Sequence, residues 1–217
     1  MINRRLPQPK PIVGSRGFTI IELMVSTIVF GVVLLVVTTA ILQFSRVYYK
    51  GLTESNLQNT TRNVVDAVAQ GIQFNGGNVT TTPASPTAGS SYAICVGNQR
   101  YSFMTGTKLV DNPGVGQSRH ILVADNVAGC TSSTLPQTLN AAAINGRELL
   151  APNMRLARFS VTSVGTNLYK VSVRVVYGDD DLLTNPSAAT AKCKNITTGT
   201  QFCAVSDITT NVVKRVQ

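Results

Sequence analysis

A single acidic side chain inside a long apolar run is where this sequence most clearly suggests chemistry. Glu22 is the only ionisable residue between positions 18 and 44, and the next charge is Arg46. A carboxylate in a bilayer costs roughly 2.5–3.5 kcal/mol at mid-depth and less near the interface. Cleavage after Gly17 would create an α-ammonium group on Phe18, one helical turn before Glu22. That ammonium is a specific cationic partner for the carboxylate.

The apolar run is long enough to span a membrane. Residues 18–44 would form a helix of about 40 Å at 1.5 Å per residue, enough to cross a bilayer with some tilt. A cleavable secretory signal fits less well, because its apolar region would be only about 7–15 residues long. The cations that precede the run, with no acid among them, are Arg4, Arg5, Lys10 and Arg16. They predict a cytoplasmic N-terminus and export of the remainder.

Residues 17–25, which read GFTIIELMV, resemble the processing site of type IV pilins and of the related type II secretion pseudopilins. In that family a membrane-embedded prepilin peptidase cuts after the glycine and methylates the new N-terminal residue. The glutamate then pairs with the ammonium of a neighbouring subunit during filament assembly. The resemblance implies cleavage between Gly17 and Phe18, N-methylation of Phe18, and a role for Glu22 in assembly. The alternative is an ordinary signal anchor with a chance acid.

The rest of the chain is large enough for one globular domain with its own core. The chain has 217 residues and a formal net charge of +9, which falls to +5 when the four leader cations are removed. An excess this mild does not require nucleic-acid binding. The expected parts are a cleaved leader at 1–17, a transmembrane and assembly helix at 18–44, an amphipathic continuation at 45–75 and an exported β-rich head at 76–217.

The four cysteines fall in the exported portion, where an even number favours two disulfides. Four cysteines allow three pairings. We favour Cys193–Cys203, which closes a short polar loop, and Cys95–Cys130 by elimination. The position of the first pair near the C-terminus resembles the disulfide-bounded loop of many pilins. His120 is the only histidine, so zinc is not expected.

Beyond residue 44 the helix is expected to continue as an amphipathic arm that ends near residues 74–77, FNGG. The apolar stripe of this arm recurs at spacings of three, four and seven, and comprises Leu57, Val64, Val65, Val68 and Ile72. We expect the stripe to pack beneath the chain's own domain.

The head sequence predicts short strands separated by turns. They are expected at residues 92–96, 100–104, 121–124, 155–164, 169–177 and 208–213. Apolar and polar residues alternate in 169–177, which is typical of a half-buried strand. The polar stretch 80–91 is typical of a surface loop, whereas 131–144 matches no regular element. The elements suit one antiparallel sheet laid on the amphipathic half of the long N-terminal helix, an α+β, pilin-like fold.

No catalytic constellation is recognisable in the sequence, so neither an enzyme nor a cofactor is expected. A nucleophile–histidine–acid set would have to use His120, and a lone histidine is more often structural. Glycine-rich phosphate loops and metal-spaced His/Cys clusters are absent from the sequence. The one candidate for a Ca²⁺ site is the acidic run Asp179, Asp180 and Asp181. Consecutive side chains rarely converge on one ion, so a solvated acidic turn is the favoured interpretation.

The sequence therefore predicts a structural, type IV pilin-like subunit, and the large, loop-rich head favours a minor pilin. One alternative is a pseudopilin of a type II secretion system, and another, from a different class, is a tip adhesin or DNA-uptake binding subunit. A signal-anchored hydrolase is disfavoured by the missing catalytic set. The implied partners are prepilin peptidase, other pilin subunits in a helical filament and an inner-membrane assembly platform. The chain would be a single-pass membrane protein before processing and then part of an extracellular or periplasmic filament.

Overall fold

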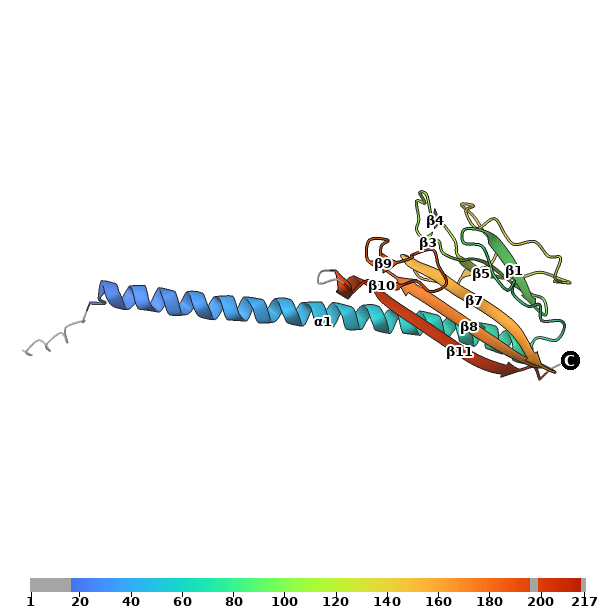
Figure 1. The fold of residues 1–217 in the computed structure, drawn as a ribbon, viewed down its shortest axis with the longest axis horizontal. Coiled ribbons are helices and arrows are strands. Elements are labelled where there is room, and N and C mark those ends of the chain that lie inside the picture. Colours follow the sequence, from blue (N-terminus) through green and yellow to red (C-terminus); the bar gives the residue numbers. More distant parts are fainter. Residues whose placement is uncertain (1–16, 196–198, 216–217) are drawn as a thin grey trace, which may run out of the picture. The chain divides into compact units, whose positions relative to one another are not determined.

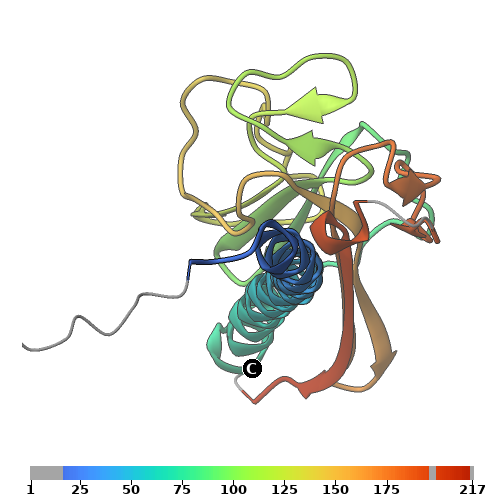
Figure 2. The same cartoon turned by 90° about the vertical axis from the view of Figure 1, so that its left-hand side faces the viewer.

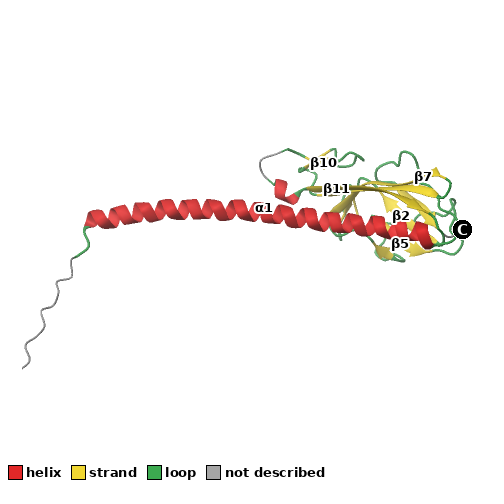
Figure 3. Cartoon of the chain, turned by 90° about the horizontal axis from the view of Figure 1, so that it is seen from below, coloured by secondary structure: helices red, strands yellow, loops and turns green. Residues whose placement is uncertain are grey.

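A computed structural model describes residues 17–195 and 199–215, which form one long helix and a β-rich head (Figure 1). Helix α1 (Ile20–Phe74) is uninterrupted (Figure 3). The chain divides into two compact units at residues 1–45 and 46–217, so α1 contributes to both. The long apolar helix followed by antiparallel-rich sheets confirms the expected α+β, pilin-like architecture. Of the expected leader, only Gly17 lies within the described residues.

The first part of α1 has no protein packed around it. Every side chain from residue 17 to residue 44 is exposed within the described chain. Among the described residues, α1 is the one helix that is long and apolar enough to cross a membrane. A helix that is hydrophobic all round needs lipid or other helices to cover it.

The second part of α1 is amphipathic, as the sequence predicts. All five stripe residues are at most 4% exposed, and they are Leu57, Val64, Val65, Val68 and Ile72. Thr61 lies buried on the same face and donates its hydroxyl to the carbonyl of Leu57 at 2.7 Å. This hydrogen bond satisfies the one polar side chain in the stripe, so the stripe packs as a continuous apolar surface.

The head contains two main sheets, so the expectation of a single antiparallel sheet is wrong. The four-stranded sheet has the order β1 (Ser91–Val96), β2 (Gln99–Met104), β5 (Leu122–Asn126) and β6 (Arg147–Glu148). The five-stranded sheet has the order β11 (Ala204–Val213), β8 (Leu168–Tyr177), β7 (Met154–Gly165), β3 (Lys108–Leu109) and β4 (Gln117–Ser118). Strands β3 and β4 are parallel. In Figure 2 the orange and red strands β7, β8 and β11 of the five-stranded sheet lie side by side.

Two hairpins join strands that the sequence predicts at 92–96 and 100–104, and at 155–164 and 169–177. Strands β1 and β2 pair antiparallel across Gly97, whose φ is 62°. A Cβ at this position would lie 2.5 Å from the carbonyl oxygen of Gly76, so only glycine fits. Strands β7 and β8 pair antiparallel across a turn in which Asn167 has a φ of 59°. The expected strand at 208–213 is correct but begins earlier, at Ala204.

Residues 78–82, the first part of the predicted surface loop, instead tie the two sheets together. Thr80 donates its N–H to the carbonyl of Cys95 at 2.9 Å, and its hydroxyl accepts the N–H of Cys95 at 2.7 Å. Thr82 makes the equivalent pair of bonds with Val161 of β7, at 3.0 and 3.2 Å. Each threonine therefore satisfies both backbone groups of one residue on a sheet edge.

The main core lies between the amphipathic half of α1 and side chains of both sheets. Its largest members include Tyr101 and the ring pair Phe103–Phe159, whose centroids are 4.9 Å apart. A second, smaller cluster buries Val176 of β8 together with residues of the segment that follows β8. That segment carries the short pair β9 (Leu183–Thr184) and β10 (Lys192–Cys193). Strand β8 is thus buried on both faces at its end, not half-buried as expected.

Two glycines of α1 differ in what surrounds them. We expect a side chain to be tolerated at Gly51 and to be destabilising at Gly71. A Cβ on Gly71 would lie 3.2 Å from the hydroxyl of Tyr101 and 3.4 Å from Val96, whereas a Cβ on Gly51 would meet nothing within 4 Å. Gly71→Val should lower the free energy of unfolding by about 1–3 kcal/mol through overpacking. Gly51→Val should change it by less than about 0.5 kcal/mol. Thermal unfolding of the detergent-solubilised chain, followed by near-ultraviolet circular dichroism, compares them; equal effects would contradict the packing.

Candidate processing and assembly site

The start of α1 is closed by a local network between Thr19 and Glu22. The carbonyl of Thr19 accepts the N–H groups of Glu22 at 3.1 Å and Leu23 at 3.2 Å. The Thr19 hydroxyl accepts the same Glu22 N–H at 3.3 Å and donates to a carboxylate oxygen of Glu22 at 3.4 Å. The Thr19 hydroxyl thus caps the helix in the way of one half of a capping box, and the Glu22 side chain bonds to that hydroxyl instead of to the Thr19 N–H.

The interpretation of the sequence missed this cap, although a signal for it was present. Residues 19–22 read TIIE, the Ser/Thr-x-x-Glu pattern that precedes an apolar run at a helix start. The cap gives Glu22 a role within its own chain. Its carboxylate lies in the first turn, where the helix dipole favours a negative charge by about 0.3–1 kcal/mol.

The two residues at the expected cleavage point are exposed. Phe18 is 73% exposed, and a Cβ built on Gly17 would meet no atom within 4 Å. The described fold therefore offers no steric reason for glycine at position 17. Further along the run, Ser26 donates its hydroxyl to the carbonyl of Glu22 at 2.7 Å and Thr38 donates to that of Leu34 at 2.7 Å. Such bonds hide polar groups from an apolar surrounding.

The structure contains both disulfides that the sequence favours. Cys95 and Cys130 have Cα atoms 5.6 Å apart, and Cys193 and Cys203 have Cα atoms 5.8 Å apart. The first bond joins β1 to the beginning of the irregular segment 130–146. The second closes the loop between β10 and the short 3₁₀ helix η1 (Thr200–Phe202).

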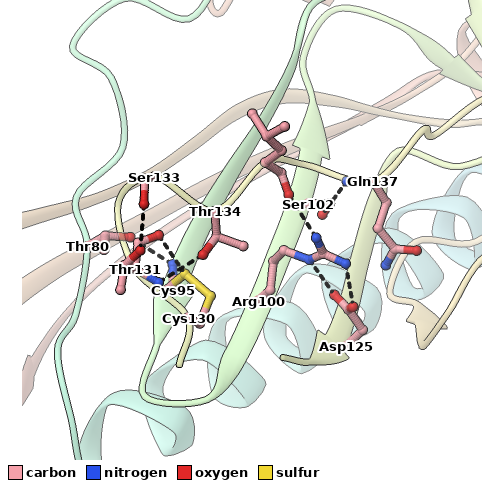
Figure 4. Close-up of a disulfide and its surroundings, with 11 residues drawn as sticks. Thr80, Cys95, Arg100, Ser102, Asp125, Cys130, Thr131, Ser133, Thr134 and Gln137 are labelled. Carbon is pink, nitrogen blue, oxygen red and sulfur yellow. Dashed lines mark hydrogen bonds and ion pairs between the residues drawn. A yellow bond between two sulfur atoms is a disulfide. The ribbon is translucent and has the colours of Figure 1, made fainter. Parts of the chain in front are cut away.

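Side chains of β2 hold the irregular segment in place (Figure 4). Arg100 forms two hydrogen bonds to Asp125, at 3.0 and 2.6 Å, and donates a third to the carbonyl of Leu135 at 2.7 Å. The hydroxyl of Ser102 accepts the N–H of Gln137 at 3.0 Å. These contacts replace regular secondary structure, which explains why no pattern in the sequence identified this segment.

The acidic run after β8 faces cations of neighbouring strands. Asp179 pairs with Lys108, and Asp180 pairs with Arg155. Arg155 is only 2% exposed and also donates to the carbonyls of Gly106 at 3.4 Å and Pro186 at 3.3 Å. Within residues 17–195 and 199–215, no group of three or more His, Cys, Asp or Glu side chains is placed to hold a metal ion. Asp179 and Asp180 fasten the segment after β8 to the sheet.

The single histidine contacts a structural carboxylate. Glu148 accepts backbone N–H groups from Ile121 at 2.9 Å, Leu122 at 3.0 Å and Leu150 at 3.1 Å. His120 Nδ1 lies 3.6 Å from Glu148 Oε2. Burial raises the pKa of the Glu148 carboxyl and lowers the pKa of the His120 imidazole. The carboxylate holds the turn before β5, and the histidine packs beside it.

The described chain has an α+β, pilin-like architecture that begins with an exposed, capped helix. The prokaryotic N-terminal methylation motif matches residues 13–38. The chain thus carries the N-terminal signature of type IV pilins and pseudopilins. This motif implies processing by prepilin peptidase and assembly with other pilins. No curated protein and no solved structure matches the chain.

The ion pairs of the acidic run predict unequal effects of removing adjacent charges. Asp180→Asn removes the anion that pairs with the buried Arg155 guanidinium, so the free energy of unfolding should fall. Because the Asp180 side chain is exposed and solvent screens its charge, we expect a loss of only about 1–2 kcal/mol. Asp181→Asn is the control, since the Asp181 side chain makes no ion pair in the described part of the chain. Urea unfolding in detergent measures both variants. Equal destabilisation would show that the run acts only through its total charge.

Proposed function

We propose that this chain is a minor pilin, a structural subunit of a type IV pilus-like filament. The observation that carries the proposal is the methylation motif at residues 13–38, located at the start of a helix whose first part has no covering within its own chain. Such a helix is stable in lipid and can exchange lipid for other helices. The chain would therefore pass from a membrane-anchored monomer into a helical filament built on an inner-membrane assembly platform.

The surroundings of Gly17 support recognition by a peptidase. Since a methyl group at this position would touch nothing in the described chain, the glycine is not required by the fold. A peptidase that must accept the backbone closely would require it, because glycine alone presents no side chain. Cleavage would leave a methylated ammonium on Phe18.

The charge at Glu22 supports assembly through an intersubunit pair. When apolar helices bundle, each Phe18 ammonium leaves water and needs an anion. A buried charge that loses its partner costs about 3–5 kcal/mol. The carboxylate of Glu22 on a neighbouring subunit would supply that anion, and its exposure in the monomer leaves it accessible.

The large head with its irregular, side-chain-held segment supports a minor rather than a major subunit. The motif itself is common to pilins and to pseudopilins of type II secretion systems, so the two roles differ in the machine the chain joins. Counting copies per sheared filament by quantitative mass spectrometry tests the minor role. Abundance equal to the main subunit, or recovery only with secretion-system components, would overturn it.

We expect processing between Gly17 and Phe18. Gly17→Ala should slow cleavage modestly and Gly17→Val should block it, because the peptidase must accommodate the new side chain. Gly31→Val is the control, since a Cβ on Gly31 also meets nothing within 4 Å but lies away from the cut. Mass mapping of the mature N-terminus reports the cut and the methyl group. A mature chain that begins at another residue would refute the assignment.

We expect Glu22 to be needed for assembly more than for insertion. Glu22→Val should be cleaved and remain in the membrane, yet its incorporation into sheared filaments should fall by two orders of magnitude or more, as about 3–5 kcal/mol implies. Thr19→Ala separates the two roles of the glutamate, because it removes the hydroxyl of the cap but keeps the charge. Immunoblots of membranes and filaments measure both. If Thr19→Ala is excluded as strongly, or Glu22→Val is incorporated normally, the intersubunit pair is wrong.

A further inference from the structure

The head carries an exposed aromatic surface where α1 enters it. We call this surface the basal patch, and its apolar members are Tyr48, Tyr49, Leu52 and Phe202. Their exposed fractions lie between 43% and 55%. Tyr49 and Phe202 are in contact, with ring centroids 6.5 Å apart. The patch therefore joins the helix to the disulfide-closed loop, although the two are about 150 residues apart in the sequence.

The loop presents Phe202 rather than burying it. The next residue, Cys203, is 3% exposed and is bonded to Cys193. The disulfide therefore fixes η1 to the head while the Phe202 ring remains half exposed. Exposing an aromatic ring forgoes roughly 1.5–3 kcal/mol of burial, and several such side chains together are typical of an interaction surface.

Cations lie close to the aromatic side chains in the sequence, at Arg46 and Lys50 beside Tyr48 and Tyr49. Arg46 is exposed, and Lys50 and Lys194 line one groove together with Glu54. Lys50 lies 3.9 Å from the Glu54 carboxylate. Lys194 donates to the backbone carbonyl of Asp181 at 2.7 Å, and within residues 17–195 and 199–215 it forms no ion pair. Three cations against one acid give the patch a net positive charge, complementary to an anionic surface.

The position of the patch in the sequence identifies that surface. Arg46 is the first charge after the apolar run that ends at residue 44. Residues 46–52 follow the end of the run by about 3–12 Å along a helix, a distance that overlaps the headgroup layer of a bilayer. Tyrosine is enriched at that level, and each cation near anionic lipid contributes about 1 kcal/mol. Phe202 shares this level because it contacts Tyr49.

We propose that the basal patch docks on anionic phospholipid headgroups of the membrane that anchors the chain. The aromatic rings enter the interfacial layer, and Arg46, Lys50 and Lys194 face the lipid phosphates. Phe202 and Lys194 are then lipid contacts of the unassembled subunit. This inference rests on the membrane anchoring contained in the proposed function. A second copy of the chain is the competing occupant of the patch.

A single introduced tryptophan tests the docking, because the chain has none. Phe202→Trp places the probe in the patch. The matched control is Val164→Trp, since Val164 and Phe202 are 51% and 50% exposed. Val164 lies at the other end of the sheet, because β11 runs ten residues from Ala204 to Val213, about 30 Å, before it reaches the β7–β8 turn.

The full chain is reconstituted in vesicles with at most one chain per vesicle, so a second copy cannot cover the probe. We expect brominated phosphatidylcholine to quench Phe202→Trp at least about twofold more than Val164→Trp, with a further increase when phosphatidylglycerol is added. High salt should remove that increase, because it screens exposed charges. Lys50→Gln combined with Lys194→Gln should remove it as well.

Equal quenching of the two probes, or quenching of Phe202→Trp that ignores lipid charge, would overturn the docking. A Phe202→Trp probe that brominated lipid does not quench, and whose emission shifts to shorter wavelength only at many chains per vesicle, would assign the patch to a second copy and also overturn the docking. Resistance of each variant to alkaline extraction is measured separately and reports the anchoring. Extraction of the chain would refute the anchoring and the docking together, whereas an anchored chain with an unquenched probe would refute the docking alone.

Discussion

The whole structure depends on one helix whose two parts require different surroundings. From residue 46 onward, α1 buries an apolar stripe against two sheets. Before residue 45, its apolar side chains are exposed on every face of the described helix. The head can therefore fold around its own part of α1, while the remainder must find lipid or other helices, since a helix that is apolar all round is not stable in water. Anchoring and assembly are two solutions to the same uncovered surface.

Within the head, specific side-chain contacts hold segments in place that have no regular secondary structure. The threonines at 80 and 82 satisfy the edges of both sheets, and Arg100 fixes a segment without strands through Asp125 and a backbone carbonyl. Arg155 does the same for the segment after β8. Removing one partner of such a contact leaves a buried polar group unsatisfied, so these irregular segments are specified by few residues.

Periodic features could be predicted from the sequence, and non-periodic ones could not. The stripe from Leu57 to Ile72 and the β7–β8 hairpin follow from spacing and turn residues alone, and the stripe is buried as expected. The link between the two sheets depends on Thr80 and Thr82, whose hydroxyls accept strand N–H groups in a way that no periodicity reveals. Val176 is buried on the outer face because the segment that follows β8 folds back over it. At the candidate site, GFTIIE indicates the processing chemistry. The cap between Thr19 and Glu22 follows from the Thr-x-x-Glu pattern, which lies inside the same motif and is easily overlooked there.

The cap and the proposed intersubunit pair at Glu22 are compatible. They differ in free energy and in the group that donates to the carboxylate, which is the Thr19 hydroxyl in the cap and the Phe18 ammonium of a neighbour in the pair. A capping interaction contributes about 0.5–2 kcal/mol, and the dipole adds a fraction of that. An ammonium buried between helices without an anion costs about 3–5 kcal/mol, which exceeds the whole cap. The carboxylate has two oxygens, and the Thr19 hydroxyl contacts one of them at 3.4 Å, a long bond that is readily given up. The monomer can therefore hold Glu22 in position at the helix start, and a neighbouring Phe18 ammonium can displace the hydroxyl at little cost.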